Sequence, residues 1–148
     1  MKQFISQLSI NTKGEGFINI TNDINSWIKV NQITEGILII NSLHTSCSFI
    51  INENADPRVL KDLESYMKAI VPEKGFKSIL KDEEKKEYLH CEEGLDDMPA
   101  HIKTALTSSS LSMSIQNSRL SLGTWQAVYL WEHRYSNHIR TINLHAIS

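Results

Sequence analysis

The sequence predicts an α+β fold with a mixed, largely antiparallel β-sheet, two longer helices and one short helix. The chain has 148 residues, which is about the length of one domain. Its apolar patterns indicate strands and helices that do not alternate strictly, as a parallel α/β sheet would require. Only three prolines and six glycines interrupt these patterns, so little of the chain is linker, and we assign residues 1–148 to a single domain.

The first part of the chain predicts a β-hairpin followed by a helix and a strand. Residues 2–10 alternate loosely between apolar and polar side chains, and residues 17–20 form a second short apolar stretch after a glycine-containing turn. Helix-capping side chains at residues 21–23 precede apolar residues at near-helical spacing, and Gly36 ends that element. The continuous apolar run at residues 36–40 is typical of a buried central strand.

A second helix and a strand-rich C-terminal third complete the prediction. Asp56 and Pro57 form a strong helix start, because aspartate caps a helix and proline suits its first position. A further strand is predicted at residues 46–51, a third short helix from residue 97, and three strands at 111–116, 120–132 and 139–147.

Composition excludes several classes of function. The net charge of −2 argues against binding of nucleic acid, which needs a strongly basic face. The N-terminus lacks an apolar core of signal-peptide length, and no apolar run approaches the roughly 20 residues of a membrane span. Cys47 and Cys91 are therefore expected to be reduced thiols. We expect a cytoplasmic protein with a small-molecule partner and with neither a membrane nor a nucleic-acid partner.

The first candidate site is His44-Thr45-Ser46, which directly follows the apolar strand. Strand ends are places where a rigid scaffold presents functional groups, and a histidine there can ligate a metal or transfer protons near neutral pH. It can also be a turn histidine that only hydrogen-bonds the backbone. The sequence leaves both interpretations open.

The most informative stretch is residues 88–103, which holds His90, Asp97 and His101. Asp97 and His101 lie four residues apart across a helix start and can share one helix face, and a glycine-containing loop can fold His90 back toward them. Imidazoles with nearby carboxylates suit zinc or another borderline divalent metal. In the alternative interpretation, Asp96 and Asp97 only cap the helix and the histidines are surface residues.

Further polar residues stand where they can face a ligand. Asn52 and Glu53 lie between a strand and a helix, and neither has a capping role of its own. Gln126 and Glu132 share one face of a predicted strand and can reach a common pocket. Arg134 and Arg140 flank a turn, where they can bind a phosphate or pair with surface acids.

Five motifs occur together in this chain: His44-Thr45-Ser46, residues 52–57, residues 96–103, residues 123–126 and Glu132-His133-Arg134. In combination they resemble the YjbQ-like family of small bacterial and archaeal proteins, and the resemblance covers nearly the whole chain. It implies an α+β fold with a mixed sheet, a homotrimer and a polar site rich in histidine. The family's working label is secondary thiamine-phosphate synthase, which rests on weak activity of that type.

Carried over position by position, the resemblance implies a metal site with a polar surround. His44, His90 and His101 would be the metal ligands. We assign catalytic roles to Glu53, Asp97, Lys103 and Glu132, and contacts with substrate to Thr45, Ser46, Asn52, Gln126 and Arg140.

Two functions are consistent with this site. The first is an enzyme that uses a divalent metal, zinc first and magnesium as the alternative, on a phosphorylated small molecule, with Lys103 neutralising pyrophosphate and Glu53 or Glu132 acting as base. Thiamine phosphate formation would then be a side reaction, because pyrophosphate chemistry usually recruits magnesium through oxygen ligands. The alternative is a non-catalytic homotrimeric module that binds a metal or a small anionic ligand with the same residues.

Overall fold

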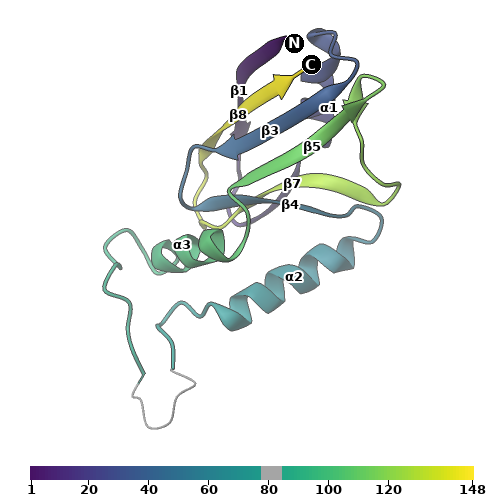
Figure 1. The fold of residues 1–148 in the computed structure, drawn as a ribbon. Coiled ribbons are helices and arrows are strands. Elements are labelled where there is room, and N and C mark those ends of the chain that lie inside the picture. The colour runs from purple at the N-terminus through teal and green to yellow at the C-terminus, as the bar shows by residue number, and fades with distance from the viewer. Residues whose placement is uncertain (78–84) are drawn as a thin grey trace.

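The computed structural model describes residues 1–77 and 85–148, and its strands form two antiparallel sheets (Figure 1). The five-stranded larger sheet has the order β1 (Gln3–Asn11), β8 (Ile139–Ile147), β3 (Gly36–Ser42), β5 (Ser110–Gln116) and β6 (Arg119–Leu120). The three-stranded smaller sheet has the order β2 (Gly16–Asn19), β7 (Gln126–Glu132) and β4 (Cys47–Glu53). The helices are α1 (Thr21–Val30), α2 (Pro57–Ile70) and α3 (Asp97–Leu106). The α+β prediction is confirmed, and every pairing between these strands is antiparallel.

The predicted N-terminal hairpin is wrong, because β1 and β2 belong to different sheets. β1 pairs with β8 along its whole length, whereas β2 pairs with β7. The link between them contains Gly14 and Gly16 at φ values of 108° and 140°, a backbone region that favours glycine. A Cβ atom at Gly14 would also lie 2.7 Å from the carbonyl oxygen of Tyr135. The link therefore leads the chain from one sheet into the other.

The strand predicted at residues 120–132 is divided in the structure. β6 ends at Leu120, and β7 begins at Gln126. Between them the Gln126 amide donates to the Gly123 carbonyl at 3.0 Å, and the Gly123 amide donates to Gln126 Oε1 at 2.8 Å. This turn carries the chain from the larger sheet to the smaller one, which an apolar pattern alone does not reveal.

The helix starts include one correct and one wrong cap prediction. Asp56 caps α2, since its Oδ1 accepts a hydrogen bond from the Arg58 amide at 2.9 Å and Pro57 is the first helical residue. α1 has no side-chain cap, because Thr21 Oγ1 instead accepts a hydrogen bond from the Val128 amide at 2.9 Å. None of the helices in the described ranges is long and apolar enough to cross a membrane.

The main core lies between the inner face of the larger sheet, α1 and the smaller sheet. Its fully buried side chains include Ile20, Ile24, Ile28, Leu38, Ile40, Phe49, Leu130 and Ile142, and each such burial contributes about 1.5–3 kcal/mol. The buried-strand prediction for β3 holds for one face only. Leu38 and Ile40 are fully buried, whereas Ile37 and Ile39 on the outer face are 55% and 36% exposed.

The smaller sheet has two ends with different surroundings. At one end Cys47 pairs with Glu132, and at the other Glu53 pairs with Gln126. α3 lies at the first end, where β4 begins and β7 ends (Figure 1). The fold thus gathers the histidine-containing segment at that end.

Candidate metal centre

The start of α3 brings two histidines and an aspartate together. Asp97 and His101 lie on one face of the helix, four residues apart, and the preceding chain returns His90 to the same place. His90 Nε2 lies 2.7 Å from Asp97 Oδ2, and His101 Nε2 lies 3.6 Å from Asp97 Oδ1. One ligand atom from each residue lies within 4.8 Å of the others. Within residues 1–77 and 85–148, no other set of three acidic, histidine or cysteine side chains is gathered in this way.

Asp97 is buried, yet one of its oxygens lacks a hydrogen-bond partner. The side chain is 2% exposed; Oδ1 accepts a hydrogen bond from Arg134 Nη1, but Oδ2 has no donor in the described part of the chain. The 2.7 Å contact with His90 Nε2 has the length of a hydrogen bond but not its direction, and misaligned contacts are weak. An unsatisfied buried oxygen costs about 1–3 kcal/mol or more, which a cation held between Asp97 and the histidines would offset.

The ring orientation of His101 leaves a lone pair for a ligand. Its Nδ1 lies 3.0 Å from the carbonyl oxygen of Thr45, and a carbonyl can only accept, so Nδ1 carries the proton. Nε2 is then the unprotonated nitrogen and faces Asp97. A backbone carbonyl that fixes the tautomer in this way is a common support for a metal-ligating histidine.

The cluster is open on one side. The side chains of His90 and His101 are 53% and 30% exposed, while Asp97 is nearly inaccessible. The two imidazole rings lie with their centroids 5.4 Å apart. Three protein ligands with an accessible side correspond to a metal site that keeps an exchangeable position, whereas structural sites are closed by four protein ligands.

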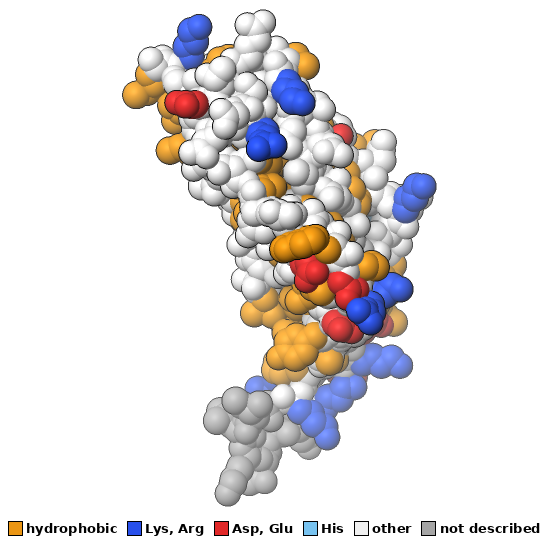
Figure 2. Space-filling model, turned by 90° about the vertical axis from the view of Figure 1, so that its right-hand side faces the viewer, with side chains coloured by type: hydrophobic (Ala, Val, Ile, Leu, Met, Phe, Trp, Pro, Cys, Tyr) orange, Lys and Arg blue, Asp and Glu red, His pale blue; other side chains and the backbone are white. Residues whose placement is uncertain are grey.

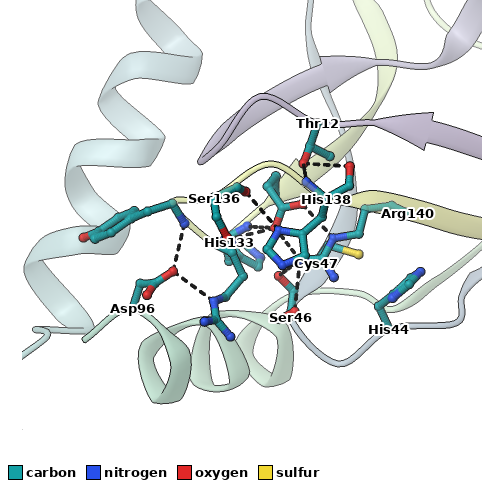
Figure 3. Close-up of polar contacts among 12 residues, drawn as sticks. Thr12, His44, Ser46, Cys47, Asp96, His133, Ser136, His138 and Arg140 are labelled. Atoms are coloured by element: carbon teal, nitrogen blue, oxygen red, sulfur yellow. Dashed lines mark hydrogen bonds and ion pairs between the residues drawn. The ribbon is translucent and has the colours of Figure 1, made fainter. Parts of the chain in front are cut away.

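Arg134 holds the acidic side of the cluster in place. Its Nε donates to Asp96 Oδ2 at 2.9 Å, its Nη1 to Asp97 Oδ1, and its Nη2 to the carbonyl oxygen of Glu93 at 2.9 Å. Asp96 also accepts from the Tyr135 amide at 2.8 Å (Figure 3). Burial alone would raise the pKa of Asp96, but the Tyr135 amide and Arg134 outweigh it and lower that pKa.

Glu132 and Arg140 form a second, fully bonded network. Arg140 Nε donates to Glu132 Oε2 at 2.6 Å, and Nη2 donates to Glu132 Oε1 at 2.5 Å and to Ser46 Oγ at 3.0 Å (Figure 3). Burial alone would raise the pKa of Glu132, but its hydrogen bonds and the charge of Arg140 lower it. The structure therefore places Glu132, Ser46 and Arg140, given catalytic and substrate-binding roles from the sequence, inside the protein. Ser46 directly follows Thr45, whose carbonyl oxygen lies against His101.

His44 is not brought to the cluster. Its Nε2 accepts a hydrogen bond from the Thr141 amide at 2.8 Å, so this lone pair is already occupied. Burial lowers the pKa of His44, and the charge of Arg140 lowers it further. The geometry is that of the turn histidine described as the alternative interpretation, and Figure 3 shows it beside Ser46 and Arg140.

Lys103 is also directed elsewhere. It is two residues from His101, or about 200° around the helix, and its Nζ lies 2.5 Å from Glu15 Oε1 with the lysine side chain 5% exposed. Lys68 contacts the other Glu15 oxygen at 2.9 Å. This ion-pair group ties α3 and α2 to the link between β1 and β2.

Three predicted site residues lie at the opposite end of the smaller sheet. Glu53 and Gln126 are paired there, six strand positions from Glu132, or about 20 Å. With Asn52 and Trp125 they line a cavity of about 550 Å³. Figure 2 views this side of the molecule, and no histidine of the described chain is visible on it. The structure thus divides the predicted site into two groups.

The sequence did not predict the carboxylates that Arg134 contacts, nor the cavity beside His90. Arg134 follows Glu132 by two residues, and only the fold shows that its guanidinium reaches Asp96 and Asp97. The cavity is formed by irregular chain, which carries no periodic signal. In the sequence, the Glu132-His133-Arg134 motif was the signal that could have pointed to Arg134 as a site residue.

Comparison with known proteins finds relatives over nearly the whole chain. Residues 6–148 match the family model described as UPF0047 protein YjbQ-like. A UPF0047 protein of Synechocystis is 44% identical over 138 residues, 93% of this chain and 87% of that protein. The UPF0047 protein YjbQ of Escherichia coli is 35% identical over 136 residues, 91% of each. A crystal structure of an uncharacterized YjbQ/UPF0047 protein from Clostridium acetobutylicum has a TM-score of 0.80 at 30% identity, covering 96% of this chain and 99% of that one.

Proposed function

This chain belongs to the YjbQ-like UPF0047 protein family, and we propose that its His90–Asp97–His101 cluster holds a divalent metal ion at which a small phosphorylated molecule reacts. The observation that carries the proposal is the buried Asp97 Oδ2, which lies 2.7 Å from His90 Nε2 and has no hydrogen-bond donor in the described ranges. A cation is the group that would satisfy it.

The donor set favours zinc. Two imidazole nitrogens and one carboxylate are typical of zinc sites with three protein ligands. Magnesium prefers oxygen ligands in near-octahedral geometry and keeps several waters, and the cluster offers one carboxylate. We therefore propose zinc as the resident ion and magnesium as a weaker substitute.

The surrounding residues would hold this centre and leave one side for substrate. A bound ion would supply Lewis-acid stabilisation of negative charge on a phosphoryl oxygen. Arg134 fixes Asp97, and the Thr45 carbonyl fixes the His101 tautomer. The accessible sides of His90 and His101 are where a phosphoryl group would approach.

Thiamine phosphate formation, which the family label suggests, remains in this account a side reaction. Lys103, the residue expected to neutralise pyrophosphate, is bonded to Glu15 on another side of α3. The imidazole-rich cluster also differs from the oxygen ligands that pyrophosphate chemistry usually recruits. A non-catalytic metal-binding module would use the same three ligands, and turnover separates it from an enzyme.

The test is metal analysis of the purified protein beside His101→Ala, with His138→Ala as control, since among the described residues the His138 ring hydrogen-bonds only the Ser136 carbonyl of its own turn. We expect about one zinc per chain in the wild type and control, and a loss of affinity of at least about 100-fold in His101→Ala, because even loss of a residue that only supports a metal ligand costs about 10–100-fold. A screen of phosphorylated compounds should then find turnover that His101→Ala loses. Absence of stoichiometric metal, or equal zinc affinity in His101→Ala, would contradict the metal site; zinc without turnover would support the binding module.

We also propose that the protein is a homotrimer, and the outer face of the larger sheet supports self-association. None of its outward positions on β1, β3, β5 and β8 is a lysine, arginine, aspartate or glutamate. These positions are Gln3, Ile5, Gln7, Ser9, Asn11, Ile37, Ile39, Asn41, Ser110, Ser112, Ser114, Gln116, Ile139, Thr141, Asn143, His145 and Ile147. Ile5, Ile37 and Ile139 are 70%, 55% and 67% exposed. An uncharged face suits contact between identical subunits, because like charges would otherwise meet.

Light scattering of Ile37→Lys tests this interface. The lysine would bring a charge into the face of each subunit, so we expect a monomer where the wild type is a trimer. Val30→Lys is the matched control, since Val30 lies on α1 and is 81% exposed. A monomeric wild type, or a trimer that Ile37→Lys leaves intact, would contradict this interface.

A further inference from the structure

A cavity of about 330 Å³ adjoins the metal cluster and has His90 in its wall. Its volume is at the lower end of the range found for small-molecule sites, roughly 300–1,000 Å³. Residues within 73–75 and 85–95 line it, with Tyr88, Cys91 and Leu95 beside His90. The other predicted site residues do not line it.

The walls of this cavity are held by defined contacts. Tyr88 Oη donates to the Pro72 carbonyl at 2.9 Å, and the backbones of Phe76 and Lys86 exchange two hydrogen bonds of 2.9 Å. Gly75 has φ of 79°, and a Cβ there would lie 2.0 Å from the Lys86 carbonyl oxygen. These contacts hold residues 72–76 against residues 86–88, and at Gly75 the spacing is one that only glycine permits.

The chemistry of the wall is mainly apolar. Tyr88 and Leu95 contribute carbon surface, and two of the wall residues are glycines. The charged residues in the wall, Glu73, Lys74, Lys85 and Glu87, balance in sign. The cavity therefore has no net charge of its own with which to attract an ion, and an anionic ligand would be held by the metal cluster at its edge.

We infer that this cavity receives the apolar, ring-sized body of the ligand, so that the molecule bound at the metal is a phosphate monoester of an apolar alcohol or phenol. The inference rests on the proposed function, because it places the phosphoryl group at the His90–Asp97–His101 cluster. His90 belongs to both sites and joins them. Sugar phosphates, whose hydroxyl groups would lose hydrogen bonds with water against Tyr88 and Leu95, would be disfavoured.

Two phosphonates that differ only in their apolar group test this inference. Phenylphosphonate and methylphosphonate present the same anion to the zinc-loaded protein, and calorimetric titration gives both affinities. We expect phenylphosphonate to bind at least about tenfold more tightly, because the ring buries more apolar surface. In Leu95→Asp the ratio should fall toward one. Leu89→Asp is the matched control, since Leu89 is 100% exposed and does not line the cavity.

A metal-free measurement separates the cavity from the metal centre. The fluorescence of anilinonaphthalene sulfonate should rise with metal-free wild type and with Leu89→Asp, and less with Leu95→Asp. Equal affinities for the two phosphonates in the wild type would overturn this inference and leave the metal site standing. A second outcome is that neither phosphonate binds, but the dye binds Leu95→Asp less than Leu89→Asp. That result would support the apolar cavity and contradict phosphoryl binding at the metal centre.

Discussion

Two arginine–carboxylate groups lie near each other in this protein, and they differ in whether their oxygens are satisfied. In the Glu132–Arg140 group both carboxylate oxygens accept hydrogen bonds, and the side chains are 0% and 4% exposed. In the Asp97–Arg134 group Oδ1 accepts a hydrogen bond from Arg134 and lies 3.6 Å from His101 Nε2, whereas Oδ2 lies 2.7 Å from the half-exposed His90 and has no donor among the described residues. The first arrangement is complete and supports structure. The second has room for one more positive partner, which is why we assign ligand binding to it.

The largest expected effect comes from breaking the complete group. Glu132→Gln should lower the free energy of unfolding by about 3–5 kcal/mol, because it leaves the Arg140 guanidinium buried without its counter-charge. Urea denaturation measures this. Arg58→Met serves as control, since its ion pair with Asp56 is at the surface, and such pairs contribute at most about 1 kcal/mol. A loss below about 1 kcal/mol in Glu132→Gln would contradict the role of the buried Glu132–Arg140 pair in stabilising the fold.

His133 holds a second buried atom without a hydrogen-bond partner in the described chain, but unlike the Asp97 cluster it has no access to solvent. Comparing the two tests whether an unsatisfied group needs that access to bind a ligand. His133 is fully buried, its Nε2 lies 2.8 Å from Ser48 Oγ, and its Nδ1 has no partner among the described residues. Burial lowers the pKa of His133 to about 3. Because the unfolded chain then binds the proton first, this contribution to stability is intact above about pH 6.5 and is lost as the pH falls toward 3.

The expected loss is about 1.4 kcal/mol per pH unit in that window, or about 3 kcal/mol at pH 4.5. Denaturation curves of wild type and His133→Gln at pH 7 and pH 4.5 isolate it from the carboxylates, which titrate in both proteins. The pH dependence should be markedly shallower in the variant. Equal slopes would mean that His133 is protonated without cost and is not sealed in the core.

The smallest effect should come from the hydrogen bond between Arg140 and Ser46, the residue that follows Thr45. Ser46→Ala removes the hydrogen bond from Arg140 to Ser46 Oγ and should lower stability by about 1 kcal/mol. It should also weaken zinc binding several-fold, because Thr45 then holds His101 less firmly. Ser65→Ala on the exposed side of α2 is the control. Unchanged zinc affinity in Ser46→Ala would separate the Glu132 group from the metal site.

Local signals predicted the elements that depend on local chemistry. The start of α2 at Asp56-Pro57 and the shared helix face of Asp97 and His101 follow from capping and from helical spacing. The division into two sheets could not be predicted, because strand pairing across the chain leaves no trace in the apolar pattern of one strand. The apolar stretches before and after Gly14 suggested a hairpin for this reason.

The candidate site was predictable only in part. His44 and His101 look alike in sequence. In the structure the Thr141 amide of β8 donates to His44 Nε2, whereas the Thr45 carbonyl accepts from His101 Nδ1 and leaves His101 Nε2 without a proton. Glu132 and Gln126 share a predicted strand face, but the length of β7 separates them by about 20 Å. Hydrogen bonds from distant strands and the direction of a lone pair decide these roles, and neither is a property of a motif.

The central claim is that the unsatisfied oxygen of Asp97 and the imidazole nitrogens of His90 and His101 together bind a cation. The most direct measurement is the free energy of unfolding of the metal-free protein before and after addition of zinc, compared with His90→Gln and with the control His138→Gln. At zinc about 100-fold above its dissociation constant, wild type and control should gain about 2.7 kcal/mol, and His90→Gln should gain little. An equal gain in all three proteins, or none in the wild type, would contradict the account.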